Sequence, residues 1–323
     1  MTGVDDQASQ TFTNTTRSLR IITRCENKDK YKSWLADKLA QACDTTNYEN
    51  ASAALGEIRA LGSLLYGFRE VDVIQESKEK TTDFVIVVDG TEIYIEVTTK
   101  QMNKEEAKAL EKFNHEPPPE KTEPVFSREH VISPAGKAKK MEDGKYETTA
   151  ENVASKIANL KAGSKQVREG SICVLWIDMQ DEDWWGTSGD NAFPITSWNG
   201  ALTTVGIWYS FYGKKGTPLF DNYCPFYGPG IHVQTMRFNG KFFQNDNRFC
   251  GAALNFGRSL VFYDDPNAKH PIPDRFWFSA VELPWFNYER SIIRWPAGLG
   301  VLEKQIEMQR NILDAFGKIK PFS

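Results

Sequence analysis

The sequence predicts an α/β protein in which helices flank a mixed central β-sheet. Three observations support this prediction: two segments with helical periodicity near the N-terminus, a pair of strand-like segments joined by Asp89-Gly90, and a later helical segment followed by an apolar run at residues 172–177. Strands that alternate with helices along a chain are typical of a sheet covered by helices. We expect this core to be followed by a β-rich region with many aromatic residues.

Two helices are predicted before the first strand. From Lys28 to Cys43, and again from Ala51 to Gly67, apolar residues recur at intervals of three and four, which is the period of one helix face. The polar residues 44–47 separate the two segments, and glycine is a typical residue at a helix C-terminus. We therefore expect an N-terminal helical segment over residues 1–48, followed by the first helix of the core.

A β-hairpin is the clearest local prediction. Residues 83–88 and 92–98 are rich in β-branched and aromatic side chains, and Asp89-Gly90 between them is a strong signal for a tight hairpin turn. A shorter segment at residues 71–74 has a similar composition and adds a strand. These segments are expected to form a compact antiparallel meander.

A charged insertion is predicted within the core. Residues 103–148 contain Pro117-Pro118-Pro119, many lysines and glutamates and little periodicity, which indicates a surface segment to which we assign no fold. Helical spacing returns from Thr149 to Val167, and the apolar run at residues 172–177 is typical of a strand buried on both faces. The core is therefore expected to cover residues 49–180.

The remaining residues, 181–323, are expected to form an aromatic, β-rich elaboration with a closing helix. Most of the tryptophans lie here, and apolar residues at helical spacing run from Leu299 to Phe316. Short strand-like segments occur at residues 205–211, 231–238, 252–255 and 260–263. Aromatic side chains beside lysines can stack the bases of a single strand, although such density more often forms a core.

Composition restricts the classes of protein to which the chain can belong. Of 323 residues, 40% are hydrophobic and 25% charged, which is ordinary for a globular protein, and no apolar run approaches the roughly 20 residues that span a bilayer. The five cysteines are scattered without a Cys-x-x-Cys pair, which argues against a disulfide framework and fits a reducing cytoplasm. The motifs of P-loop ATPases, dinucleotide-binding folds and serine hydrolases do not occur in the sequence. We expect a cytoplasmic protein without a membrane segment.

Two carboxylates are predicted to meet at one end of the hairpin. Asp83 opens one strand and Glu96 lies near the end of its partner, and Glu96, Thr98 and Lys100 share one face because side chains alternate along a strand. A carboxylate in a central strand is costly unless it is paired or bound to a metal. Because Mg²⁺ is bound by one or two carboxylates together with water and phosphate, the pattern predicts a site for Mg²⁺ or Mn²⁺ that activates water for attack on a phosphodiester.

A series of features occurs in a defined order between residues 50 and 180. They are a helix with a glutamate, Gly56-Glu57-Ile58; a strand that opens with Asp83-Phe84; a hairpin; the strand Tyr94-Ile95-Glu96-Val97; and a helix and strand at residues 156–166 and 174–177. Together they resemble the core of the PD-(D/E)xK, restriction-endonuclease-like nuclease superfamily. The resemblance implies a restriction-endonuclease-like fold that hydrolyses nucleic acid, with Asp83 and Glu96 holding the metal and Glu57 supporting it directly or through water.

The sequence departs from the family pattern at one position. A lysine is expected two residues after the glutamate, where this chain has Thr98. Lys100 lies on the same predicted face, and Lys161 lies at the edge of the apolar stripe of the following predicted helix. We expect Lys161, in preference to Lys100, to supply the ammonium group. The alternative is a catalytically inactive nuclease-like fold that binds nucleic acid or a protein partner.

The resemblance also implies a biological setting. It favours DNA over RNA as the substrate and suggests a role in restriction or host defence, and it leaves open a homo-oligomer or a protein partner. Each candidate residue also has a simpler structural interpretation. Asp83 can satisfy local backbone donors, Glu57 can reach solvent from the helix edge, and Lys161 can belong to a solvated helix face.

Overall fold

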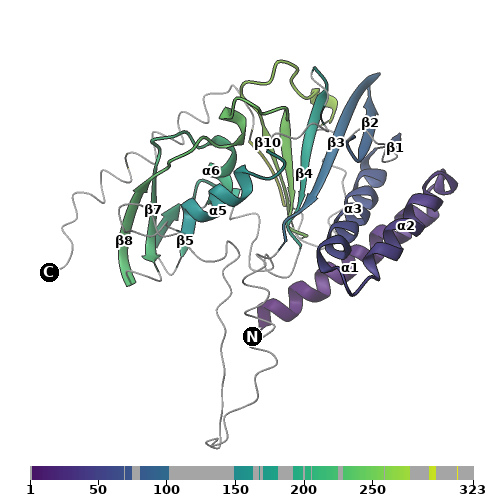
Figure 1. Ribbon diagram of the computed structural model, residues 1–323, viewed down its shortest axis with the longest axis horizontal. Helices are drawn as coiled ribbons and strands as arrows, with labels where there is room; N and C mark the ends of the chain where they lie inside the picture. The colour runs from purple at the N-terminus through teal and green to yellow at the C-terminus, as the bar shows by residue number, and fades with distance from the viewer. Residues whose placement is uncertain are drawn as a thin grey trace, which may run out of the picture.

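The computed structural model describes most of the chain outside one long central segment and the C-terminal region (Figure 1). The described residues are 2–68, 70–74, 81–101, 149–162, 167, 170–180, 192–198, 201–204, 206–224, 228–257, 259–276, 291–295 and 311. The predicted insertion at 103–148 lies outside them, as does the predicted closing helix apart from residue 311. Within these residues no helix is both long and apolar enough to cross a membrane.

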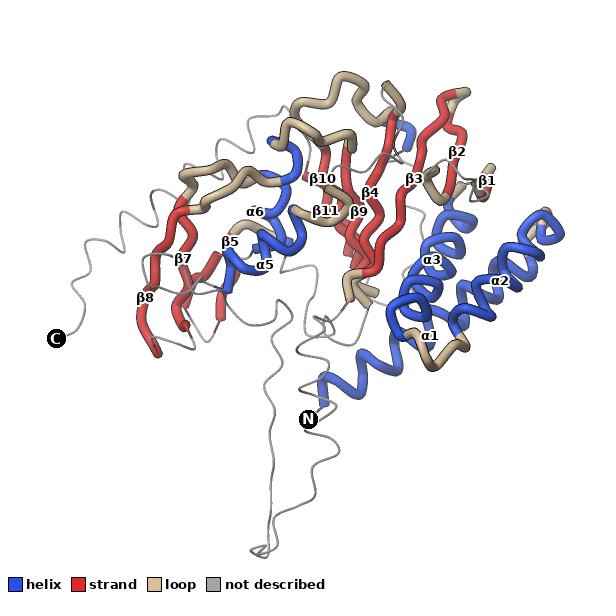
Figure 2. Tube along the Cα trace, viewed as in Figure 1, coloured by secondary structure: helices blue, strands red, loops and turns tan. Residues whose placement is uncertain are grey.

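A seven-stranded mixed sheet forms the centre of the fold, in the order β1-β2-β3-β4-β9-β10-β11 (Figure 2). The first three strands are antiparallel, β3, β4 and β9 run parallel to one another, β10 is antiparallel to β9, and β11 is parallel to β10. Their bounds are β1 Val71–Val73, β2 Phe84–Val88, β3 Thr91–Thr99, β4 Ile172–Asp178, β9 Gly251–Asn255, β10 Ser259–Asp264 and β11 Ser291–Trp295. The predicted α/β class with a mixed, helix-flanked sheet is confirmed.

The hairpin between β2 and β3 forms as predicted. Asp89 and Gly90 both adopt positive φ, 50° and 76°, which is the backbone of a type I′ turn. This turn matches the right-handed twist of the two strands, and it fixes the register in which Phe84 pairs with Ile95.

Helices α1, α2 and α3 cover one face of the sheet (Figure 1). They span Thr2–Arg24, Lys32–Ala42 and Tyr48–Gly67, and a short 3₁₀ helix, η1 Lys28–Tyr31, precedes α2. The apolar side of α3 packs against β3, which presents Ile93, Ile95 and Val97 to it. The approach is close at Gly56, where a Cβ atom would lie 2.0 Å from Thr99 Oγ1. Helices α2 and α3 were each predicted, and α1 lies in the segment 1–48 that was predicted to be helical, although no helix was assigned to residues 2–24.

Helices α5 and α6 cover the opposite face, together with the aromatic region (Figure 1). They span Thr149–Ala158 and Gly206–Tyr212. The prediction of a strand at residues 205–211 is wrong, because this segment is α6. Trp208, Tyr209 and Phe211 are all buried, so the helix is apolar on every side and lacks the periodicity that identifies a surface helix.

The aromatic region contributes strands in two ways. Two hairpins lie beyond α5 and α6, formed by β5 Ile195–Trp198 with β6 Ala201–Thr204 and by β7 Pro218–Cys224 with β8 Gly228–Thr235. Strands β9, β10 and β11 instead extend the central sheet. The boundary predicted at residue 180 is therefore not a boundary of the sheet, because parallel pairing of β4 with β9 continues the hydrogen-bonded ladder across it.

Candidate metal centre and active site

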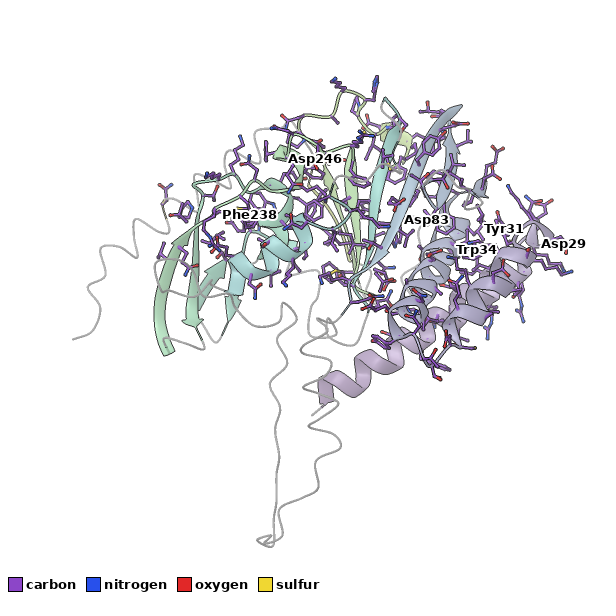
Figure 3. All side chains as sticks on the ribbon, in the orientation of Figure 1. Asp29, Tyr31, Trp34, Asp83, Phe238 and Asp246 are labelled. Carbon is purple, nitrogen blue, oxygen red and sulfur yellow. The ribbon has the colours of Figure 1, made fainter. Side chains whose placement is uncertain are left out.

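The hairpin brings Asp83 and Glu96 together on the face of the sheet covered by α5. Phe84 and Ile95 are paired and point toward α3, so their neighbours Asp83 and Glu96 lie on the other face, across the hairpin from one another. The Asp83 carboxylate is anchored there because its Oδ2 accepts a hydrogen bond of 2.7 Å from the Val97 backbone N–H. Figure 3 labels Asp83 beside the β2–β3 hairpin. The predicted meeting of the two carboxylates is thus present in the structure.

Glu96 is fully buried, and only one of its two carboxylate oxygens has a partner. Oε1 accepts a hydrogen bond of 2.6 Å from Lys161 Nζ, whereas Oε2 has no hydrogen-bond donor among the described residues. Burial raises the pKa of Glu96 to about 7, the negative charge of Asp83 adds to this effect, and Lys161 opposes it. A buried carboxylate oxygen without a donor is costly, and it is suited to bind a cation.

Lys161 reaches Glu96 from a strained turn. Helix α5 ends at Ala158, so the prediction that Lys161 lies on a helix is wrong. The residue has a φ of 52°, which is unusual for a residue other than glycine, and its side chain is 29% exposed. Such strain persists only where surrounding structure imposes it, and it is concentrated at functional sites. The structure places the Lys161 ammonium against Glu96, and the catalytic role expected for it stays a prediction.

Lys100 is engaged elsewhere. Its Nζ donates to the carbonyl oxygen of the next residue, Gln101, at 3.2 Å, and its backbone N–H donates to Asp178 O. Thr98, at the position where the family pattern has lysine, is half-buried on the same strand face as Glu96. Lys161 therefore approaches the carboxylate from a different element than the pattern predicts.

Glu57 lies on α3, which covers the opposite face of the sheet. Its Oε2 accepts from Lys38 Nζ of α2 at 2.7 Å, and both side chains are largely buried. The Glu57 charge nevertheless raises the pKa of Glu96, although less than Asp83 does. Among the described residues no three Asp, Glu, His or Cys side chains are grouped closely enough to hold a metal. The structure thus shows an effect of Glu57 on Glu96 through its charge, and the expectation that Glu57 supports the metal directly or through water stays a prediction.

The residues present fit a Mg²⁺ or Mn²⁺ ion. These ions take oxygen ligands, often from one or two carboxylates, and leave the other positions to water and phosphate oxygens. Asp83 and Glu96 supply the two carboxylates, and the donor-free Oε2 of Glu96 supplies a ligand atom. An added cation would also relieve the repulsion between the two charges.

Sequence reasoning missed a second buried charge pair, on the α3 face. The Arg59 guanidinium donates two hydrogen bonds of 2.9 Å to the Asp178 carboxylate at the end of β4. Gln180 donates to the same carboxylate and accepts from Asn14 of α1, so this network attaches α1 to the sheet. Two features of the sequence could have indicated this pair. Arg59 stands within the apolar stripe of a predicted helix, and Asp178 follows the apolar run at residues 172–177.

Comparisons with known proteins give no relative for this chain. No family model matches it, and no match was found among curated proteins or solved structures. Any functional conclusion must therefore come from the chain's own residues.

Proposed function

We propose that the protein is a metal-dependent nuclease that hydrolyses phosphodiester bonds of nucleic acid at Asp83 and Glu96. One observation carries the proposal: a fully buried glutamate with a donor-free oxygen stands beside a second carboxylate, and a lysine in a strained turn contacts it. Such an arrangement destabilises the fold by itself, so a functional role for it is favoured.

Each residue has a defined task in this proposal. Asp83 and Glu96 would hold Mg²⁺ or Mn²⁺, and the ion would supply an activated water and offset negative charge on the phosphodiester. Lys161, with its ammonium 2.6 Å from Glu96, donates to the oxygen on which charge develops. Glu57 adds negative charge from α3, which strengthens the attraction of the pair for a cation. Nucleic acid is the substrate class, with DNA in preference to RNA, and restriction or host defence is the proposed setting.

The alternative is a nuclease-like fold that binds nucleic acid or a protein without hydrolysis. The ion pair between Lys161 and Glu96 favours this alternative, because Lys161 neutralises part of the Glu96 charge without a metal. Thr98 at the lysine position also favours this alternative, since among the described residues Lys161 is then the lysine that contacts Glu96.

The experiment that separates these functions is a cleavage assay on plasmid, linear duplex, single-stranded DNA and RNA in Mg²⁺ or Mn²⁺. Glu96→Gln removes the charged ligand with little change in volume. Glu92→Gln is the matched control, because Glu92 is an exposed residue of the same strand, four positions away. We expect the wild type and Glu92→Gln to cut and Glu96→Gln to be inactive. Silence of all three proteins, or equal cutting by all three, would contradict hydrolysis at Glu96.

A further inference from the structure

A second buried cation lies close to the proposed active site, and the described part of the chain places no counter-ion in contact with it. Lys241, in the 3₁₀ helix η4 Lys241–Phe243, is only 2% exposed. No described residue forms a hydrogen bond or ion pair with its ammonium, which lies 5.4 Å from the centre of the Phe249 ring. Burial lowers the pKa of Lys241 to about 8, and the negative charge of Asp246 partly offsets this effect. The ammonium is therefore still mostly charged at neutral pH. Besides the Phe249 ring, the ammonium nitrogen keeps some contact with solvent, so a ligand can reach it.

Contacts on both sides of Lys241 fix its position in the fold. Gly240 packs against α6 so closely that a Cβ atom would lie 2.7 Å from the carbonyl oxygens of Tyr209 and Phe211. The amide Nε2 of Gln244 donates to Ala158 O at the end of α5. These contacts fix residues 240–244 beside the turn that contains Lys161.

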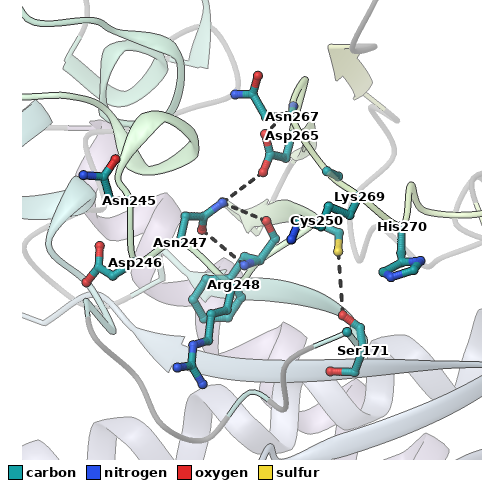
Figure 4. A pocket seen from close by; sticks show the side chains of 13 residues that line it. Ser171, Asn245, Asp246, Asn247, Arg248, Cys250, Asp265, Asn267, Lys269 and His270 are labelled. Carbon is teal, nitrogen blue, oxygen red and sulfur yellow. Dashed lines mark hydrogen bonds between the residues drawn. The ribbon is translucent and has the colours of Figure 1, made fainter.

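A small cavity joins these cations. Lys161, Lys241 and Arg248 line it together with Gln244, and its volume of about 10 Å³ is about the space of one water oxygen. Asp246 is the carboxylate among its described lining residues, and it is exposed. Arg248 donates one N–H to Val167 O at 3.1 Å, which orients the guanidinium. Residues 246–249 also line a larger cavity of about 420 Å³ (Figure 4), which gives room for the rest of a ligand.

We propose that this small cavity is a phosphate subsite, which takes one non-bridging oxygen of a nucleic-acid phosphate between Lys161, Lys241 and Arg248. The inference rests on the proposed function, and it specifies how that function's substrate is held. Lys161 belongs to both sites, because it contacts Glu96 and lines the cavity. The phosphate in the subsite is therefore the scissile phosphate or its neighbour.

The test is the salt dependence of DNA binding, measured by fluorescence anisotropy with a labelled oligonucleotide in EDTA, where cleavage is suppressed. Lys241→Met keeps most of the side-chain volume and removes the charge, and Lys28→Met is the control at an exposed lysine in η1. One lost phosphate contact reduces the slope of log K against log salt by about 0.9 for a duplex and about 0.7 for a single strand. We expect this reduction, and weaker binding, in Lys241→Met only, with a melting temperature equal to or above that of wild type.

The outcomes for the subsite and for hydrolysis are distinct. If Lys241→Met binds with the wild-type slope, or if the wild type binds no DNA, the subsite does not exist. If Lys241→Met shows the reduced slope but the wild type cuts nothing in Mg²⁺, the subsite stands and hydrolysis fails. If Lys241→Met does not fold, Arg248→Met, a change at an exposed residue of the same cavity, must show the reduced slope. Competition by inorganic phosphate distinguishes a site for free phosphate from one that requires the nucleic-acid chain.

Discussion

Replacing Glu96 with glutamine should stabilise the metal-free protein at alkaline pH. The pKa of Glu96 is about 7 in the fold against an ordinary value of 4.5, chiefly because of burial and of the Asp83 charge. Each unit of difference in pKa corresponds to about 1.4 kcal/mol. Ionisation of this side chain therefore lowers the free energy of unfolding by about 3 kcal/mol. Glutamine retains an oxygen to accept from Lys161, and it never ionises.

The sign of the pH dependence follows from the raised pKa. Below about pH 4.5 the side chain is protonated in both states, and the stability that it contributes is fully present. Between about pH 4.5 and 7 the folded protein holds one proton more than the unfolded chain, so stability falls as the pH rises. Above about pH 7 no further loss from this group is expected.

Urea unfolding at a series of pH values in EDTA measures this effect. We expect the difference in unfolding free energy between Glu96→Gln and wild type to grow from near zero at pH 4.5 toward about 3 kcal/mol in favour of the variant at pH 8. Glu92→Gln, at an exposed position of the same strand, is the control and should not show this growth. A Glu96→Gln protein that is less stable than wild type at pH 8, or that keeps the wild-type pH dependence, would refute the argument.

Three further outcomes follow from the same geometry. Asp178→Asn leaves the charge of Arg59 buried without its partner, so the urea midpoint should fall by an amount equivalent to about 3–5 kcal/mol, and an unchanged midpoint would contradict the burial of this pair. Lys161→Met should lower the cleavage rate about 10²–10³-fold because it removes the donor to the developing charge, whereas Lys100→Met should cut at the wild-type rate. Adding Thr98→Lys to Lys161→Met should restore part of the rate, since residue 98 shares a strand face with Glu96, and a double variant no faster than Lys161→Met would argue against this placement.

Local patterns predicted the hairpin and its carboxylates well. The turn at Asp89-Gly90 follows from the backbone preferences of these two residues, and alternation along a strand then places Asp83 and Glu96 on one face. These features depend on residues that are close in sequence. The α/β class follows similarly from the order of the periodic segments.

Features that depend on distant residues were predicted less well. Helix α5 ends at Ala158, whose carbonyl oxygen accepts from the distant Gln244, whereas helical spacing alone placed Lys161 on a longer helix. The burial of Lys241 could not be predicted, because it requires Gly240 to pack against α6, itself expected to be a strand. In both cases tertiary contacts override the local pattern.

Direct titration of Mn²⁺ by isothermal calorimetry tests the central claim that Asp83 and Glu96 form a divalent-metal site. We expect one site in the wild type, its loss in Asp83→Asn, and its retention in Glu92→Gln. Because Glu96 has a pKa of about 7, metal binding near pH 6.5 should release protons, and the measured heat should change with the ionisation enthalpy of the buffer. No binding to the wild type, or equal binding to Asp83→Asn, would contradict the claim.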